Sequence, residues 1–318
     1  MPLPKPRDDE NRSDFVTRCM SDEQVLSDFS TINQRYAVCN NIYGEPPVKK
    51  QVKLNRNKFR RAYKKGYQKL YKTTARKNNK IAVQFYKKGF NNAIKDFLRN
   101  NEIIKENYTV FFQEKTTKDM YLQMYTQTSL AFYNWYLNSY KSFIKKQVST
   151  EETMTDFITQ YVLYSGRLNT KINSVQKTAI KSIVSEFTKA MKDEQFAKES
   201  RLGKSKILQK RLNGRALWEA RRIVVTETTL ASNLGAEKAA MTAFKKEELV
   251  KDWIIGSSMN HREGHLALDG QDPIPMDKSF QNPVTGVYMR IPGEGPSSET
   301  INCSCSVAFI PNPELFNE

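Results

Sequence analysis

The sequence predicts an α+β protein whose N-terminal two-thirds is mainly α-helical and whose C-terminal end is a small α+β domain. Residues 48–272 contain no proline, which breaks helices, and only four of the 13 glycines precede residue 201. Residues 273–318 hold seven of the 12 prolines and are therefore expected to form loops and strands. The length of 318 residues is enough for roughly two domains.

The same composition divides the chain into four parts. Residues 1–48 are polar and proline-rich, with Pro46-Pro47 as a stiff hinge, and are expected to form a flexible arm that becomes ordered only against a partner. Residues 49–200 are predicted to be a basic helical region, residues 201–310 the α+β domain, and residues 311–318 a tail.

The positive charge of the chain is concentrated in one segment. Residues 49–100 contain 18 lysines and arginines against one acid, Asp96, so this segment carries a net charge of +17. The other 266 residues hold 33 side chains of each sign. Such a segment suits a polyanion, most simply nucleic acid. Nothing in it indicates base-specific contacts, so we expect sequence-independent binding to double-stranded DNA.

An aromatic stripe runs along this basic segment at steps of three and four residues, which places Phe59, Tyr63, Tyr67, Leu70 and Tyr71 on one helical face. A second helix is expected over residues 83–98. We interpret the stripe as core, with tyrosines that stack on exposed bases as the alternative. Under both interpretations the opposite face is free to meet phosphates. The predicted DNA contacts are Lys58, Arg60, Arg61, Lys64, Lys65, Lys69, Lys72, Arg76 and Lys77.

Secretion and membrane insertion are disfavoured by the sequence. The longest apolar patch, residues 130–137, is shorter than the ~20 residues of a membrane span, and the N-terminus has no apolar core of a signal peptide. Cys19 and Cys39 are expected to stand alone, in a pattern typical of a reducing compartment. The closely spaced Cys303 and Cys305 are a pair that could bind metal.

A long helix is expected over residues 216–244, after a turn at Asn213-Gly214. Its apolar positions step by three and four, and Glu227 falls within that stripe. A buried carboxylate is costly unless it is paired. We therefore expect Glu227 to be structural and to pair with Arg262 or His265, which would lock the helix to the C-terminal loop.

Three strands are expected in the C-terminal domain, over residues 251–255, 287–292 and 301–310. Alternation in the last strand places Cys303 and Cys305 on one face, among apolar neighbours. The two thiols are therefore predicted to point the same way.

Three separated blocks in the C-terminal part of the sequence form a distinctive set. In the first block, Thr226 and Glu227 match an isoleucine-x-arginine-threonine-glutamate pattern, with Val225 in place of the arginine. The second block matches an arginine-x-x-histidine-x-x-x-aspartate-glycine pattern, and the last follows an asparagine-cysteine-arginine-cysteine pattern with Ser304 in place of the arginine. The matching residues of these two blocks are Arg262, His265, Asp269, Gly270, Asn302, Cys303 and Cys305. Together the blocks resemble the phage Mu F-like head-morphogenesis family of minor head (minor capsid) proteins, over roughly residues 170–310, about 45% of the chain.

This resemblance implies a virion protein without enzymatic activity, present in few copies in the interior of the head. It implies association with the portal protein, contacts with the major capsid or scaffold protein, and roles in head morphogenesis and genome packaging or delivery. It places the protein in the host cytoplasm during assembly. No membrane partner is expected.

The residues themselves also argue against an enzyme. No GxSxG, Walker A, HExxH or Rossmann pattern is present. The alternative function is a DNA-binding accessory protein or a metal-dependent nuclease that uses the C-terminal histidine and cysteine site. The spacing of Cys303 and Cys305 does not fit the usual metal knuckles of such nucleases.

Two arrangements of the C-terminal polar residues remain open from sequence. In one, zinc is held by His265, Cys303 and Cys305, with His261, Asp269 or Glu227 as the fourth ligand. In the other, no cofactor is bound and the thiols fill core space beside a structural cluster. That cluster would comprise Glu227, Arg262, His265, Asp269 and Asn302.

Overall fold

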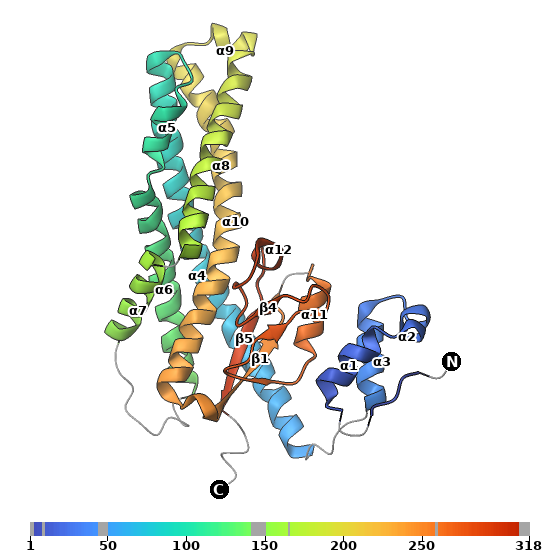
Figure 1. Ribbon diagram of the computed structural model, residues 1–318. Coiled ribbons are helices and arrows are strands. Elements are labelled where there is room, and N and C mark those ends of the chain that lie inside the picture. The colour runs from blue at the N-terminus through green and yellow to red at the C-terminus, as the bar shows by residue number, and fades with distance from the viewer. Residues whose placement is uncertain are drawn as a thin grey trace. The chain divides into compact units, whose positions relative to one another are not determined.

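The computed structural model describes residues 3–7, 10–43, 50–140, 151–164, 166–257 and 260–311. The chain forms two compact units: unit 1 comprises Met1–Lys69 and Ala240–Glu318, and unit 2 comprises Leu70–Ala239. The structure confirms the predicted fold class, because helices dominate and a small antiparallel sheet lies near the C-terminal end of the chain (Figure 1). The units do not follow the predicted domain boundaries, because each of the two longest helices contributes to both.

Unit 2 is a bundle of long helices and short connecting ones (Figure 1). Its elements are α4 (Lys50–Asn100, from Leu70 onward in this unit), α5 (Lys105–Phe111), α6 (Glu114–Ser139), α7 (Glu151–Tyr164), α8 (Gly166–Met191), α9 (Glu194–Lys198) and α10 (Arg201–Ala243, up to Ala239 in this unit).

Helix α4 is continuous for 51 residues, so the prediction of two helices in the basic segment is wrong. The apolar pattern lapses near Asn78, but this side chain is buried and hydrogen-bonded rather than exposed in a break. Its amide nitrogen donates to Thr128 at 2.9 Å and to Thr228 at 2.8 Å. Partners on α6 and α10 thus satisfy the polar residue, and the helix runs through it.

The predicted turn at Asn213-Gly214 is also wrong, because both residues lie exposed within α10. Leu208, Leu212 and Ala216 are fully or almost fully buried and carry the apolar stripe of the helix past the glycine. A glycine in a helix costs about 1 kcal/mol relative to alanine, which packing of this stripe offsets.

Two glycines of unit 2 are required by close packing. A β-carbon at Gly89 would overlap the ring of Phe112, which packs against Phe85, Tyr86 and Phe90. A β-carbon at Gly235 would overlap the backbone of Ser129, so α6 and α10 approach closely at this point. These contacts fix the register of the helices in the bundle.

Unit 1 contains a three-stranded antiparallel sheet of order β2-β1-β5 and a two-stranded β3-β4 pair. In the main sheet Trp253 of β1 lies opposite Val307 of β5. The elements are α1 (Arg12–Met20), α2 (Glu23–Asp28), α3 (Ile32–Tyr43), the 3-10 helix η1 (Lys246–Glu248), β1 (Leu249–Ile254), α11 (Glu263–Asp269), β2 (Ile274–Pro275), β3 (Phe280–Gln281), β4 (Tyr288–Met289), α12 (Ser297–Thr300) and β5 (Ser306–Pro311), with the start of α4.

The segment predicted to be a flexible arm instead folds into three short helices over its described residues. Asn11 and Asp22 cap α1 and α2 through their side chains. Phe15, Val25 and the two cysteines of α1 and α3 are completely buried in a small core. The expectation that Cys19 and Cys39 stand alone is wrong, because a disulfide joins them where α1 packs against α3. Residues 44–48 of the predicted arm lie outside the described residues.

The strand predictions are confirmed in part. The expected strand over residues 251–255 is β1, whereas the one over 287–292 is limited to Tyr288–Met289. The last strand begins at Ser306 rather than at residue 301. Its predicted start fails because Asn302 has a φ of 58°, in the left-handed region, and forms a turn after α12. Residues 312–318 of the predicted tail lie outside the described residues.

The predicted aromatic stripe of α4 is core at Tyr63 and Tyr67, whereas Phe59, Leu70 and Tyr71 are half-buried. In unit 1 Tyr63 and Tyr67 are 4% and 2% exposed, and the Tyr63 hydroxyl donates to the carbonyl oxygen of Val307 at 2.7 Å. Arg60 forms ion pairs with Asp252 and Asp269. The first part of α4 is therefore tied to the sheet of unit 1. Within the described residues, no helix combines the length and the apolar character that a membrane crossing needs.

Candidate functional site

A buried histidine lies at the centre of the C-terminal part of unit 1. His265 is on α11 and is 2% exposed, and its Nε2 lies 2.9 Å from Oε2 of Glu299. Gly264 lets α11 approach the turn that carries Asn282, because a β-carbon there would overlap the Asn282 amide. The helix is thereby held with one imidazole nitrogen toward Glu299 and the other toward the cysteines.

Both predicted cysteines face this histidine. The Nδ1 atom of His265 lies 3.6 Å from Sγ of Cys303 and 3.6 Å from Sγ of Cys305. The prediction that the two thiols point the same way is confirmed. The cause differs from the predicted strand alternation, because both cysteines precede β5, next to the turn at Asn302.

The three side chains have the spacing of metal ligands. Their ligand atoms all lie within 4.8 Å of one another. In a tetrahedral zinc site with a Zn–S bond of about 2.3 Å and a Zn–N bond of about 2.0 Å, nitrogen and sulfur ligands are about 3.5 Å apart. The two distances of 3.6 Å from His265 agree with that geometry. This group is the part of the predicted metal site that the structure brings together.

The environment of the two sulfurs favours a thiolate at Cys303. A hydrogen bond from the Cys305 side chain, and after it the contact with His265, hold the pKa of Cys303 well below its usual range despite burial. The backbone N–H of Cys305 also donates to Sγ of Cys303, at 3.5 Å. The sulfur of Cys303 and burial together raise the pKa of Cys305. One of the two cysteines is therefore prepared to act as a ligand, because metals bind the thiolate form.

Glu299 connects the histidine to the surrounding loops. Its carboxylate accepts hydrogen bonds from Asn282 at 3.1 Å and from Thr285 at 2.9 Å, in addition to the contact with His265. A carboxylate on the second ring nitrogen orients a metal-binding histidine and fixes its tautomer. Sequence reasoning missed Glu299, which has no local pattern that distinguishes it from a surface glutamate.

A turn holds the partners of Glu299 in place. The side-chain oxygen of Asn282 accepts the backbone N–H groups of Val284 at 2.9 Å and Thr285 at 3.2 Å, which forms an Asx turn. The run Asn282-Pro283 followed by Gly286 is a turn signal in the sequence. That signal indicates the turn, although it does not indicate which carboxylate the turn serves.

Aromatic side chains close the site. The Trp253 ring from β1 packs edge-on against His265 and against Phe280, each at 5.2 Å between ring centroids. The indole nitrogen of Trp253 is buried as well. The resulting dry environment strengthens electrostatic interactions with the cysteine sulfurs.

The other members of the predicted structural cluster lie elsewhere. In unit 2 Glu227 accepts a hydrogen bond from Tyr125 at 2.6 Å and pairs with Lys171, so its predicted pairing with Arg262 or His265 is wrong. Burial, and after it the charge of Glu227, raise the pKa of Tyr125 well above its usual range, which keeps the phenol a donor.

The remaining predicted residues have separate roles in unit 1. Arg262 donates to the carbonyl oxygen of Ile301 at 2.7 Å. Asp269 pairs with Arg60 and accepts the backbone N–H of Ile255 at 2.9 Å. Asn302 forms the left-handed turn described above. His261 is half-buried and is not among the residues with metal-ligand spacing.

The predicted DNA contacts differ in their exposure. Lys64 is half-buried, and Arg60 is engaged by two carboxylates and is therefore not available to phosphates. Lys58 lies outside the residues whose side chains the structure describes. The exposed members are Arg61, Lys65 and Lys69 in unit 1, and Lys72, Arg76 and Lys77 in unit 2.

The division into units shows where the surplus charge lies. Unit 2 holds 30 lysines and arginines against 15 acids, a net charge of +15, whereas unit 1 holds 21 against 19, a net charge of +2. The basic character therefore extends beyond the α4 segment to the rest of the helical bundle.

Comparisons with known proteins add no family to this description. No family model, no curated protein and no solved structure matches the chain.

Proposed function

We propose that this protein is a phage minor head protein, a non-enzymatic virion component that binds DNA. The observation that carries the proposal is a line of exposed cations on α4 in unit 2. Lys72, Arg76, Lys80 and Lys87 follow one another at steps of four, four and seven residues, so they share one helical face. The resemblance of residues 170–310 to Mu F-like head proteins supports the assignment to the head.

A helix of this kind binds DNA through its phosphates. Lysine and arginine release condensed counterions when they neutralise phosphates, and the affinity then falls steeply with salt. The buried side of α4 is packed against the bundle, so the backbone of the exposed face is already ordered and only its side chains lose conformational freedom on binding. No base-specific contact is implied, and the ligand is double-stranded DNA of any sequence.

Fluorescence anisotropy with a labelled 30-base-pair duplex tests the DNA-binding part. The variant Lys72→Ala/Arg76→Ala/Lys80→Ala removes three cations. It is expected to reduce the slope of log affinity against log salt by about 2.7. The matched control is Lys177→Ala/Lys181→Ala, which removes two exposed cations of α8. Equal slopes for the wild type and the α4 variant would exclude DNA binding by this helix.

The head assignment has its own experiment. We propose a location inside the head with the portal protein as the main partner, contacts with the major capsid or scaffold protein, and passage through the host cytoplasm during assembly. Mass spectrometry of purified virions before and after DNA ejection should detect the chain at few copies per particle. Crosslinking in those particles should join it to the portal. Virions that lack the chain would contradict the assignment.

The burial of the histidine and cysteine cluster favours a structural role over a nuclease. His265, Cys303 and Cys305 are each at most 3% exposed, so a phosphodiester has no access to them. Incubation of the protein with supercoiled plasmid and divalent metal ions should leave the plasmid uncut. Cleavage that disappears in His265→Ala would establish the nuclease instead.

We propose in addition that His265, Cys303 and Cys305 bind one zinc ion that stabilises unit 1. The agreement of both nitrogen–sulfur distances with tetrahedral geometry supports this, as does the carboxylate of Glu299 on the second ring nitrogen. The ion would join α11 to the segment before β5, in a domain whose three short strands have only two residues each.

Elemental analysis of protein purified without chelators tests the zinc site. We expect about one zinc per chain in the wild type and little in Cys303→Ser, with Cys19→Ser/Cys39→Ser, which leaves no unpaired thiol behind, as the cysteine control outside the site. Protein that contains no zinc, and that takes up none when zinc is added to the reduced chain, would favour the metal-free cluster.

A further inference from the structure

The first half of α10 is a second basic segment that is hidden in the composition of the whole chain. Residues 201–222 hold eight lysines and arginines against a single acid, Glu219, which is 5% exposed. This one carboxylate lies 4.0 Å from Arg222, so the segment keeps a large excess of positive charge. This segment escapes notice when charge is summed over the chain, because acids in other elements balance it.

Only some of these cations are used within the bundle. Arg211 pairs with Asp193 at 2.9 Å, and Arg215 lies 3.5 Å from Glu186. The exposed cations that remain between residues 206 and 221 are Lys206, Lys210 and Arg221. They lie at steps of four and eleven residues, which places them along one line of the helix. At a rise of 1.5 Å per residue, that line is roughly 22 Å long.

An exposed tryptophan lies beside this line. The Trp218 side chain is 51% exposed, and the guanidinium of Arg222 is 4.7 Å from its ring centroid. The cation–π contact orients the ring, so little side-chain entropy is lost when the indole meets a ligand. Exposed aromatics within a basic surface serve as stacking platforms for bases or pack on sugars in nucleic-acid-binding proteins.

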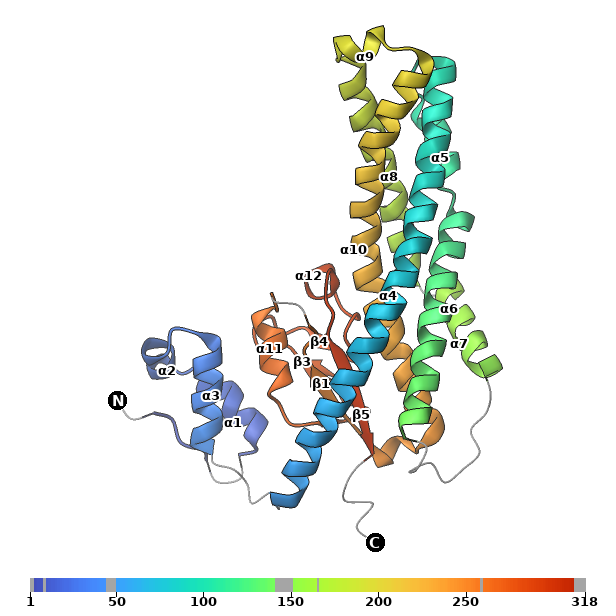
Figure 2. The ribbon, with the colours of Figure 1, turned by 180° about the vertical axis from the view of Figure 1, so that it is seen from behind.

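The basic surface of α10 lies on a helix that neighbours α4. The hydroxyl of Tyr71 on α4 donates to the carbonyl oxygen of Val225 on α10 at 3.1 Å, and Asn78 reaches Thr228. Figure 2 shows the two helices next to each other on the near side of unit 2. Cations on both helices can therefore act on one extended polyanion.

We infer that the exposed face of α10 from Lys206 to Arg222 is a second DNA-binding surface, where cations meet phosphates and Trp218 packs on a sugar or an unstacked base. The inference rests on the proposed DNA-binding function and adds a second contact surface to it. An acidic protein partner fits less well. A docking helix presents apolar residues at steps of three and four along its length, whereas Leu217 and Trp218 are the large apolar side chains that this stretch exposes.

Salt titrations of the full chain with the same 30-base-pair duplex test the surface. The variant Lys206→Ala/Lys210→Ala/Arg221→Ala should lower the ratio of affinities at 50 and 200 mM salt about 40-fold, because three phosphate contacts are lost. The control Lys177→Ala/Lys181→Ala on α8 should leave this ratio unchanged. If the α10 variant has the same ratio of affinities as the wild type, the inference is overturned. The proposed function would still stand in that case if the α4 variant shows its expected reduction in the slope of log affinity against log salt.

The tryptophan is tested by its own fluorescence. Trp253 is completely buried in unit 1 and Trp135 is half-buried, so Trp218 is the most exposed of the three tryptophans. Duplex DNA and a 30-nucleotide single strand should quench the emission of the wild type, and Trp218→Phe should lose most of that quenching. Stronger quenching by the single strand would identify base stacking, and equal quenching would identify sugar contact. Quenching that persists in Trp218→Phe would show that Trp218 does not contact DNA and is not part of the proposed DNA-binding surface.

Discussion

Arg60 is the counter-charge of Asp252, a carboxylate that β1 places in the interior of unit 1 with 1% of its side chain exposed. The same guanidinium pairs with Asp269 at 2.8 Å and donates to the carbonyl oxygen of Trp253 at 3.2 Å. One arginine of the basic helix therefore neutralises two acids of the C-terminal domain. Its neighbour Arg61 is exposed, so adjacent cations of one helix have different roles.

Replacement of Arg60 by alanine should destabilise the protein by about 3–5 kcal/mol, because it removes a cation that is paired with the buried carboxylate of Asp252. Arg61→Ala is the matched control and should change the free energy of unfolding by less than about 0.5 kcal/mol. Urea denaturation followed by circular dichroism measures both variants. Equal stability of the two would show that the ion pair contributes little to folding.

Glu227→Gln should destabilise unit 2. The buried carboxylate accepts a hydrogen bond from the Tyr125 hydroxyl, and its negative charge neutralises the ammonium group of Lys171. A double-mutant cycle with Lys171→Met should give a coupling energy of about 0.5–3 kcal/mol. If the protein is a head component, the same variant should be incorporated less into virions. A coupling energy of zero would show that the ion pair between Glu227 and Lys171 does not contribute to stability.

Two glycines of α10 should respond in opposite directions to alanine. Gly214 is exposed within the helix, and no neighbouring element among the described residues comes within 4 Å of the place that a β-carbon would take, so Gly214→Ala should stabilise by about 1 kcal/mol. Gly235 meets the backbone of Ser129, so Gly235→Ala should destabilise by about 1–3 kcal/mol. Thermal unfolding measures both. Stabilisation by Gly235→Ala would contradict the close approach of α6 and α10.

The Glu10–Arg18 ion pair should make the N-terminal helices sensitive to acid. The hydrogen bond from Arg18 is the main cause that lowers the pKa of Glu10 from 4.5 to about 2. A carboxylate with a lowered pKa stabilises the folded state above the unfolded value, and this contribution is lost as the pH falls from about 4.5 through about 2. NMR titration of the Glu10 carboxyl should show the low midpoint. In Arg18→Gln the midpoint should return toward 4.5, and a midpoint that stays low would assign the shift to another cause.

Reduction of the Cys19–Cys39 disulfide should loosen the three N-terminal helices. The bond closes a loop with a sequence separation of 20 residues, for which the loss of chain entropy in the unfolded state gives about 3 kcal/mol of stability. The buried core around it is small, so this is a large share of what holds the helices together. Limited proteolysis should cut within α1–α3 after reduction and in Cys19→Ser/Cys39→Ser. Unchanged resistance to protease would show that packing alone is sufficient.

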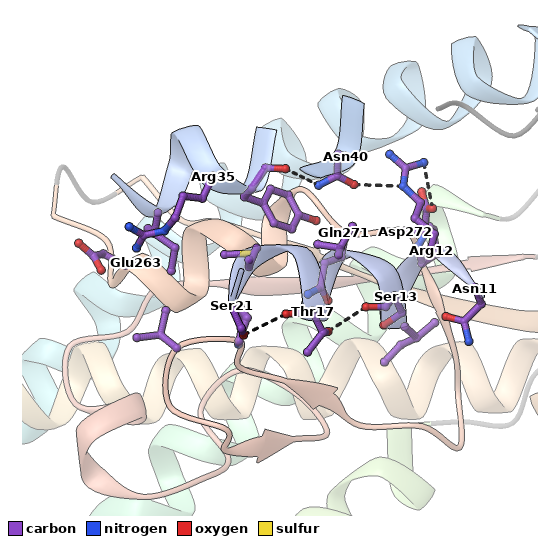
Figure 3. A pocket seen from close by; sticks show the side chains of 18 residues that line it. Asn11, Arg12, Ser13, Thr17, Ser21, Arg35, Asn40, Glu263, Gln271 and Asp272 are labelled. Atoms are coloured by element: carbon purple, nitrogen blue, oxygen red, sulfur yellow. Dashed lines mark hydrogen bonds and ion pairs between the residues drawn. The ribbon is translucent and has the colours of Figure 1, made fainter. Parts of the chain in front are cut away.

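A pocket depends on these same helices. Its volume is about 550 Å³, and it lies between α1 and α3 on one side and the loop after α11 on the other, within unit 1 (Figure 3). Arg12 spans its rim, with Nε donating to Asn40 at 3.0 Å and Nη1 lying 3.6 Å from Asp272. Loss of the disulfide should also change the shape of this pocket, because the disulfide joins the two helices that form one of its sides.

Patterns among neighbouring residues in the sequence predicted features that depend on local structure, namely which helical residues are buried and where a strand forms. Helical periodicity identified Tyr63 and Tyr67 as core residues, and the apolar run near Trp253 identified β1. The pairing of charges was not predictable in the same way. Glu227 was recognised as a buried acid, but its partner Lys171 lies 56 residues away on another helix, and any cation on a packed face satisfies the same requirement.

The candidate site shows the same limit. His265, Cys303 and Cys305 were identified as a group because their residue types are chemically distinctive. Glu299 was not, although it contacts His265 directly. A glutamate in a short helix after several loops has no pattern that distinguishes it from a solvated residue, and only the packing of those loops brings it to the imidazole.

The contacts of Glu299 determine where this domain tolerates engineering. The turn that contains Asn282 and Thr285 is joined to the carboxylate by side-chain hydrogen bonds, so an insertion there would displace both donors. The exposed residues Asp277 to Ser279 have no side-chain hydrogen bond to Glu299. A peptide tag or a fluorescent label placed at this second position would leave both hydrogen bonds to Glu299 intact, although the two loops look equally permissive from their length and polarity.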